Sequence, residues 1–136
     1  MAQTSSAFVA DPELLLELRK RSTPIDLGGN RILFRQGEEP KGVFILNRGI
    51  ARLTTRSDGD AILSVQAAPG SLLGVPAVVG SKPYSLTAEA LDGAEISFLT
   101  CDEFVHLMYT EPALSFRVLQ VLAEEVRFAR ESLSRL

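Results

Sequence analysis

The chain has 136 residues, a formal net charge of −3 and 46% hydrophobic residues, which together indicate one globular domain with a sizeable core. The weak acidic balance provides no clustered basic surface for nucleic acid, and no apolar run reaches the roughly 18 residues that a membrane-spanning helix needs. The single Cys101 excludes an internal disulfide and a cysteine metal cluster, and the N-terminus has no secretory signal. We therefore expect a cytoplasmic protein.

Residues 1–23 form the first zone and are expected to contain a short helix. Asp11 suits the N-cap and Pro12 suits the first turn. An apolar stripe at helical spacing consists of Leu14, Leu15 and Leu18. The basic run 19–21 falls at the helix C-terminus, where positive charge meets the helix dipole favourably; a phosphate site is the alternative.

Residues 24–100 form the second zone, whose pattern is typical of β structure. Short apolar runs alternate with turn signals at a spacing of about 8 to 12 residues, which favours a sandwich or barrel over βαβ units. The runs are 32–34, 43–46, 50–55, 61–67, 85–91 and 94–99. The pairs Asp58-Gly59 and Asp92-Gly93 predict hairpins, because a tight hairpin turn favours residues that adopt positive φ.

Residues 101–136 form the third zone, which is helical. Thr100 and Glu103 have the spacing of a capping box, so a short helix is expected over 101–109. Thr110 is a candidate second cap, and Pro112 suits the first turn of a long helix that continues to the last residue.

The long helix carries a heptad pattern that is typical of a coiled coil. Its apolar positions follow alternating spacings of three and four residues: Leu119, Leu122, Val126, Ala129, Leu133 and Leu136. Glu125 and Arg130 fall on the flanks, where they would face each other in a parallel homodimer. We call these eight residues the seam and predict that it pairs with a second copy.

A helix packed on its own domain is the alternative interpretation of the same segment. The pattern spans fewer than the three or four heptads that usually define a coiled coil. A second apolar strip beside the seam consists of Val118, Val121 and Phe128. Two strips suit one helix that contacts both its own β-domain and a partner.

Three motifs resemble the effector domain of the catabolite-activator and fumarate-nitrate-reductase regulator family. They are the strand and turn 32–40, the segment 43–53 with Gly49 at a hairpin turn, and the Pro-Gly segment 69–74. The resemblance covers residues 8–136 and implies a cyclic-nucleotide-binding-like domain. Its expected fold is mostly β with flanking helices, namely a jelly-roll-like double-stranded β-helix (β-roll) followed by a long dimerisation helix.

The same resemblance places the phosphate-binding cassette of nucleotide-binding relatives after residue 73. Relatives hold the ribose with a glutamate and the phosphate with an arginine; those positions are Val75 and Tyr84 here. Gly74 and Ser85 match the cassette, whereas the adenine-reading Thr-Ser pair of the long helix is replaced at 129–130. The ribose, phosphate and base contacts of the relatives are therefore all altered.

An unpaired buried phosphate loses several kcal/mol of hydration, so we predict that cyclic AMP and cyclic GMP are not bound in the usual way. The candidate pocket consists of Leu73, Gly74, Val75, Pro76, Ala77, Tyr84, Ser85 and Leu86, with Val78 and Val79 adding to its apolar wall. It could hold an effector of another kind or be filled by its own side chains. Tyr84 is expected either to contact a ligand or to be a plain core aromatic.

The expected function is that of a homodimeric, non-enzymatic regulatory sensor without a cofactor or metal. Alternatives are a scaffold dimer with a filled pocket and, less favoured, a cupin-like enzyme, which would need several histidines where this chain has only His106. The sequence stops where the family's winged helix-turn-helix begins, so no specific DNA binding is expected of this chain alone. No membrane partner is expected.

Overall fold

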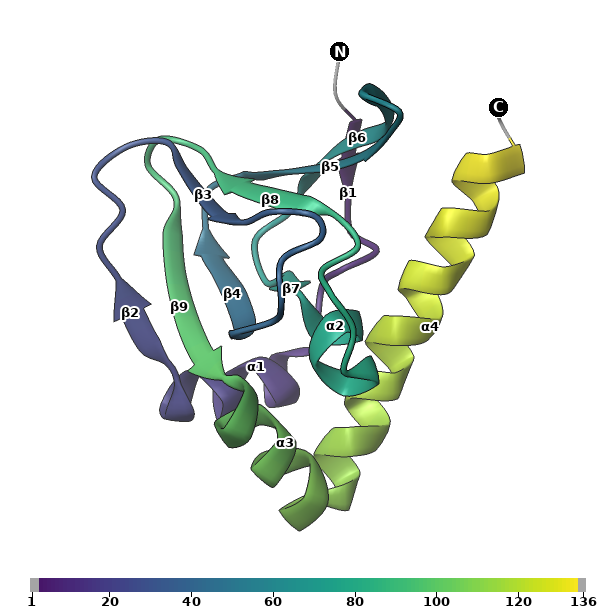
Figure 1. Cartoon of the computed structure of the whole chain (residues 1–136). Coiled ribbons are helices and arrows are strands. Elements are labelled where there is room, and N and C mark those ends of the chain that lie inside the picture. Colours follow the sequence, from purple (N-terminus) through teal and green to yellow (C-terminus); the bar gives the residue numbers. More distant parts are fainter. Residues whose placement is uncertain (1–2, 135–136) are drawn as a thin grey trace.

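A computed structural model describes residues 3–134 and contains two β-sheets flanked by helices (Figure 1). The larger sheet has the strand order β1-β6-β5-β8-β3 and the smaller sheet has the order β2-β9-β4-β7. The strands are β1 (Gln3–Ser5), β2 (Thr23–Ile25), β3 (Arg31–Phe34), β4 (Gly42–Arg48), β5 (Ala51–Ser57), β6 (Asp60–Ala67), β7 (Leu72–Leu73), β8 (Thr87–Ala90) and β9 (Glu95–Thr100). This mostly β architecture with flanking helices confirms the predicted fold class.

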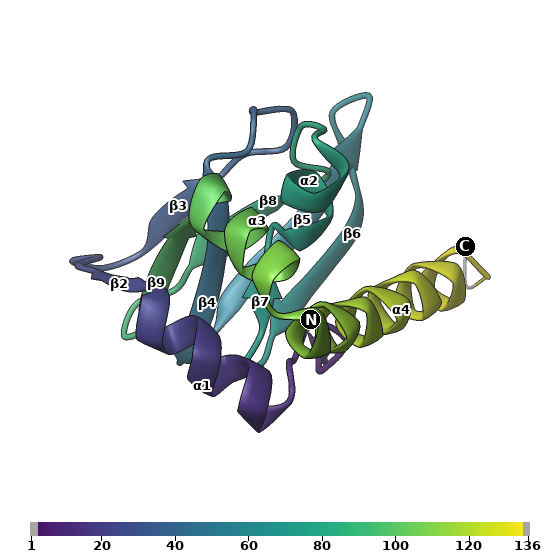
Figure 2. The same cartoon turned by 90° about the horizontal axis from the view of Figure 1, so that it is seen from below.

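Four helices surround the sheets in the part of the chain that the structure describes. They are α1 (Pro12–Arg21), α2 (Val75–Gly80), α3 (Cys101–Thr110) and α4 (Pro112–Ser134). Figure 2, seen from below, shows α1 and α3 in front of the sheets and α4 running outward along one side. None of the described helices has the length and apolar character needed to cross a bilayer.

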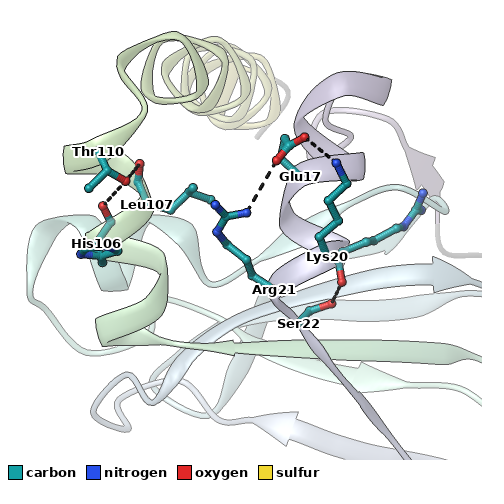
Figure 3. A network of polar contacts seen from close by, with 8 residues as sticks. Glu17, Lys20, Arg21, Ser22, His106, Leu107 and Thr110 are labelled. Carbon is teal, nitrogen blue, oxygen red and sulfur yellow. Dashed lines mark hydrogen bonds and ion pairs between the residues drawn. The ribbon is translucent and has the colours of Figure 1, made fainter.

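Side-chain caps begin two helices as predicted. The Asp11 carboxylate accepts a hydrogen bond from the Leu14 amide at 3.1 Å, and Thr100 and Glu103 form both halves of a capping box. The prediction for Thr110 was wrong. This residue ends α3, and its hydroxyl donates to the His106 carbonyl at 3.0 Å, so it serves the preceding helix (Figure 3).

The basic run at the end of α1 is engaged locally. Lys20 and Arg21 both pair with Glu17 one turn earlier, at 3.0 and 3.6 Å (Figure 3). Arg19 donates to the Asn47 side chain of β4 at 2.7 Å. These contacts, together with the dipole of α1, account for the run as a solvated helix end.

The corner glycines connect the two sheets, and here the hairpin predictions were partly wrong. Asp58 and Gly59 do form the β5–β6 hairpin, with φ of 53° and 85°. Gly93 instead lies between β8 and β9, and Gly49 between β4 and β5, and each pair of strands divides between the sheets. Gly49 has φ +86°, and a Cβ there would lie 2.7 Å from the Ala94 Cα, so the two corners pack tightly.

The core has two parts that meet along α4. One lies between α1, α3, the first half of α4 and the smaller sheet, and it buries Val118 and Val121. The other lies between the sheets, where Phe128 of α4 packs edge-on against Phe8 with ring centroids 5.8 Å apart. The second apolar strip of the long helix therefore packs on its own domain.

Candidate functional site

A small cavity lies between α2, the segment that follows it, the larger sheet and the second half of α4. Its lining residues are Phe8, Phe34, Leu53, Leu73, Gly74, Pro76, Ala77, Tyr84, Ser85, Leu86 and Glu125. The free space is about 20 Å³, which is room for about one water-sized group. Seven of the predicted pocket residues line the cavity, and aromatic and acidic residues from elements distant in sequence complete its wall.

Helix α2 forms one wall of the cavity. Gly74 precedes it with φ +94°, and a Cβ at this position would lie 2.9 Å from Tyr84 Cε1, so only glycine fits there without a shift. Pro76 lies in the first turn, where its missing N–H is tolerated.

Three predicted pocket residues do not line the cavity. Val75 is fully buried and packs with Val78 in the other core, against α1 and α3. Val79 is 51% exposed on the outer surface. A helix of one and a half turns points only one side inward, so Pro76 and Ala77 line the cavity while their neighbours do not.

Tyr84 is built into the core of the domain. Its ring stacks on Phe34 with centroids 3.8 Å apart. Its hydroxyl accepts from the Lys41 and Gly42 amides at 3.0 and 3.3 Å and donates to the Gly42 carbonyl at 2.9 Å. Burial raises the pKa of Tyr84 above its ordinary value, so the hydroxyl stays neutral. These contacts match the core-aromatic alternative, although the ring also forms part of the cavity wall.

Glu125 introduces an acidic group that the sequence analysis placed on an exposed flank of the seam. Glu125 lines the cavity and is partly buried, and its Oε2 has no hydrogen-bond partner among residues 3–134. Burial alone raises the pKa of Glu125 to about 8. The residue continues the spacing of Val118, Val121 and Phe128, so this inner strip is the signal that could have located it.

Apart from Glu125, the seam lies on the neighbouring face of α4. Leu119, Val126 and Leu133 are 57%, 49% and 63% exposed. Ala129 and Arg130 are also exposed, whereas Leu122 packs partly on the core. Leu136 lies outside the described residues. Most of this face of α4 is therefore exposed within residues 3–134.

A second, larger hollow separates α2 from the seam. It measures about 450 Å³ and is lined by Pro76, Val79, Gly80, Leu122, Glu125, Val126 and Ala129. Glu125 lines both hollows, so its carboxyl lies at the boundary between the cavity and the seam.

The two soft metal-ligand candidates lie away from the cavity. His106 is exposed on α3, and the Cys101 thiol donates to the Pro40 carbonyl at 3.3 Å. Within residues 3–134, no three histidine, cysteine or acidic side chains are grouped as metal ligands would be.

Known proteins of similar sequence and structure indicate the same kind of domain. The family model described as "Cyclic nucleotide-binding domain" matches residues 25–111. The transcriptional activator protein FnrA of Stutzerimonas stutzeri is 25% identical over 123 residues, which are 90% of this chain and 49% of that protein. The chain thus spans about half the length of this curated relative.

Two solved structures share the fold at low sequence identity. The catabolite activator protein of Thermus thermophilus has a TM-score of 0.76 at 21% identity, covering 91% of this chain and 59% of that one. The sensor domain of the transcriptional regulator DNR from Pseudomonas aeruginosa has a TM-score of 0.66 at 18% identity, covering 89% and 82%. With the family model spanning more than half of the chain, these findings show that it belongs to the cyclic nucleotide-binding domain family.

Proposed function

We propose that this domain is a cytoplasmic, non-catalytic sensor whose altered cassette does not hold cyclic AMP or cyclic GMP in the usual way. In this function α4 pairs with a second copy of the chain, and the paired helices transmit the signal. The observation that supports it is the cavity wall, which has no basic side chain and contains Tyr84 and the unpaired Oε2 of Glu125.

Charge is the first argument against a cyclic phosphate in this cavity. A buried phosphate needs a cation or several N–H donors, and none of the lining side chains is basic. The Tyr84 hydroxyl cannot turn toward a ligand without leaving two backbone amides unpaired. An ionised Glu125 would repel the anion.

Space is the second argument. The enclosed volume of about 20 Å³ admits about one water-sized group, far less than a nucleotide. Any larger ligand would need α2 or the second half of α4 to move. Binding would thereby be coupled to the position of α4, as a two-state sensor requires.

The exposed seam supports the pairing of α4 with a second copy. Leu119, Val126 and Leu133 recur at seven-residue spacing, and each is about half exposed or more in the described chain. A two-fold dimer would bury each of them twice, at about 1.5 to 3 kcal/mol for a fully buried aliphatic side chain.

Thermal unfolding with and without nucleotide tests the ligand part of the proposal. A ligand at 100 times its Kd stabilises the folded state by about 2.7 kcal/mol. Because cyclic AMP and cyclic GMP are not expected to bind, neither nucleotide should shift the Tm. A saturable rise in Tm at sub-millimolar nucleotide would overturn the proposal.

A ligand-free scaffold dimer is the second candidate, favoured by the small volume of the cavity. In that case α4 would pair constitutively and the stacked Phe34 and Tyr84 rings would serve only as core. Native mass spectrometry of the purified dimer separates the two candidates, because a sensor should retain or accept a small molecule that perturbs residues 74–85.

A further inference from the structure

The Glu125 carboxyl is an unexplained polar group in an otherwise apolar cavity. Seven of its neighbours in the lining have purely aliphatic or aromatic side chains: Phe8, Phe34, Leu53, Leu73, Pro76, Ala77 and Leu86. Tyr84 is the one other titratable lining residue, and its hydroxyl is occupied by backbone partners. A group so placed normally has a hydrogen-bond partner, because an unpaired buried polar atom is costly.

Within the described residues of its own chain, no basic side chain forms an ion pair with Glu125. Helix α2 carries no charged residue, and the strands β3, β5 and β7 contribute Phe34, Leu53 and Leu73 to the wall. On α4, the neighbouring Glu124 and Arg127 are exposed. Within the described residues the carboxyl has no ion-pair partner, since each ion pair there involves other residues.

We propose that the cavity binds the primary ammonium group of a small molecule, with the Glu125 carboxylate as its acceptor and the carbon atoms of the ligand extending through the mouth of the cavity. This inference deepens the proposed sensor function by naming the ligand class. Here the protein would supply the anion and the ligand the cation, whereas in a phosphate cassette the protein supplies the cation.

Size and charge both select an ammonium group. The space of about 20 Å³ fits one tetrahedral NH₃⁺, which is about the size of water, but not a planar guanidinium or a phosphate. A neutral apolar ligand would leave the carboxyl unpaired, whereas an ammonium satisfies it with a charge-assisted hydrogen bond. Exposed Pro76 and Ser85 mark the mouth, through which the remainder of the ligand would extend.

Proton release is the specific consequence of this arrangement. With a pKa of about 8, the Glu125 carboxyl is protonated at pH 6 to 7 in the empty cavity. Binding of R-NH₃⁺ then forms the carboxylate–ammonium pair and expels one proton to solvent. Affinity should therefore increase about tenfold per pH unit below pH 8 and level off above it.

The test uses methylammonium and ethylammonium chloride, with tetramethylammonium chloride and sodium acetate at equal ionic strength as controls. Amide NMR signals of residues 74–86 and 125 report binding, and calorimetry in buffers of different ionisation enthalpy reports proton release. We expect saturable shifts with the primary ammonium ions, tenfold tighter at pH 7 than at pH 6, and one proton released.

Variants separate recognition by Glu125 from nonspecific binding. Glu125→Gln should lose at least tenfold in affinity, whereas Glu124→Gln, on the exposed face, should bind normally. Ala77→Leu fills the cavity without changing charge and should also abolish binding, which keeps the test decisive if Glu125→Gln fails to fold. Equal shifts with tetramethylammonium or acetate, or unchanged binding by Glu125→Gln, would overturn the inference. That result would leave the sensor function intact, whereas saturable binding of cyclic AMP in the same NMR titration would overturn the sensor proposal.

Discussion

The buried carboxyl of Glu125 makes a pH-dependent contribution to stability whose sign is unusual for an acid. Its pKa rises from 4.5 in the unfolded chain to about 8 in the folded domain, so the folded state holds the proton more tightly. Stability from this group is therefore greatest at and below pH 4.5, declines as pH rises from 4.5 to 8, and is constant above that.

The magnitude follows from the two pKa values. Each pKa unit corresponds to 1.36 kcal/mol, so the full difference is on the order of 5 kcal/mol. Most of it, about 3 kcal/mol, falls between pH 5 and pH 8. Glu125→Gln removes the titration, so the free energy of unfolding of the variant, measured relative to the native chain, should rise by about 3 kcal/mol over this interval.

Urea unfolding at pH 5, 6.5 and 8, at one protein concentration, measures this difference. The Glu124→Gln variant is the matched control and should run parallel to the native chain, because its side chain is exposed. Asp11 and Glu103 have lowered pKa values from their capping hydrogen bonds, and their effects fall below pH 5. If Glu125→Gln also runs parallel, the carboxyl is either solvated or paired with a cation, and the burial argument fails.

Three further variants test the dimer, the aromatic wall and the corner between the sheets. Val126→Glu should give a folded monomer by sedimentation, because it places two like charges in the seam of a dimer. A folded dimer would show that the interface lies elsewhere. Outright unfolding would show that this part of α4 packs in the core of its own domain. Tyr84→Phe should lose about 1 to 3 kcal/mol in chemical unfolding, since two backbone amides lose their acceptor; an unchanged midpoint would mean that water replaces the hydroxyl. Gly49→Ala should lose at least about 1 to 3 kcal/mol, because φ of +86° and the Ala94 backbone both oppose a Cβ, and a neutral result would contradict the tight corner.

The amino-acid sequence by itself determined the elements whose signals are local. Asp11 and the Thr100–Glu103 box begin their helices because a cap needs only the adjacent turn. The longer strands follow from apolar runs between turn residues, and Asp58-Gly59 makes its hairpin because the turn conformation is specified by the two residues themselves. The short strands β1, β2 and β7 lack such a pattern and exist only because longer neighbours offer them hydrogen bonds.

Tertiary structure decided which elements meet. Gly49 and Gly93 looked like hairpin turns, yet β5 pairs with β6 and β8 instead of β4, and β9 pairs with β4 and β2 instead of β8. These corners therefore change sheet. The seam and the inner strip of α4 could both be identified from spacing. Glu125 continues the spacing of the inner strip, but because it is charged it was assigned to the seam. Only the packing of α4 against Phe8 and α2 turns its carboxyl inward, because the rotation of a helix about its axis is set by the surface that it buries.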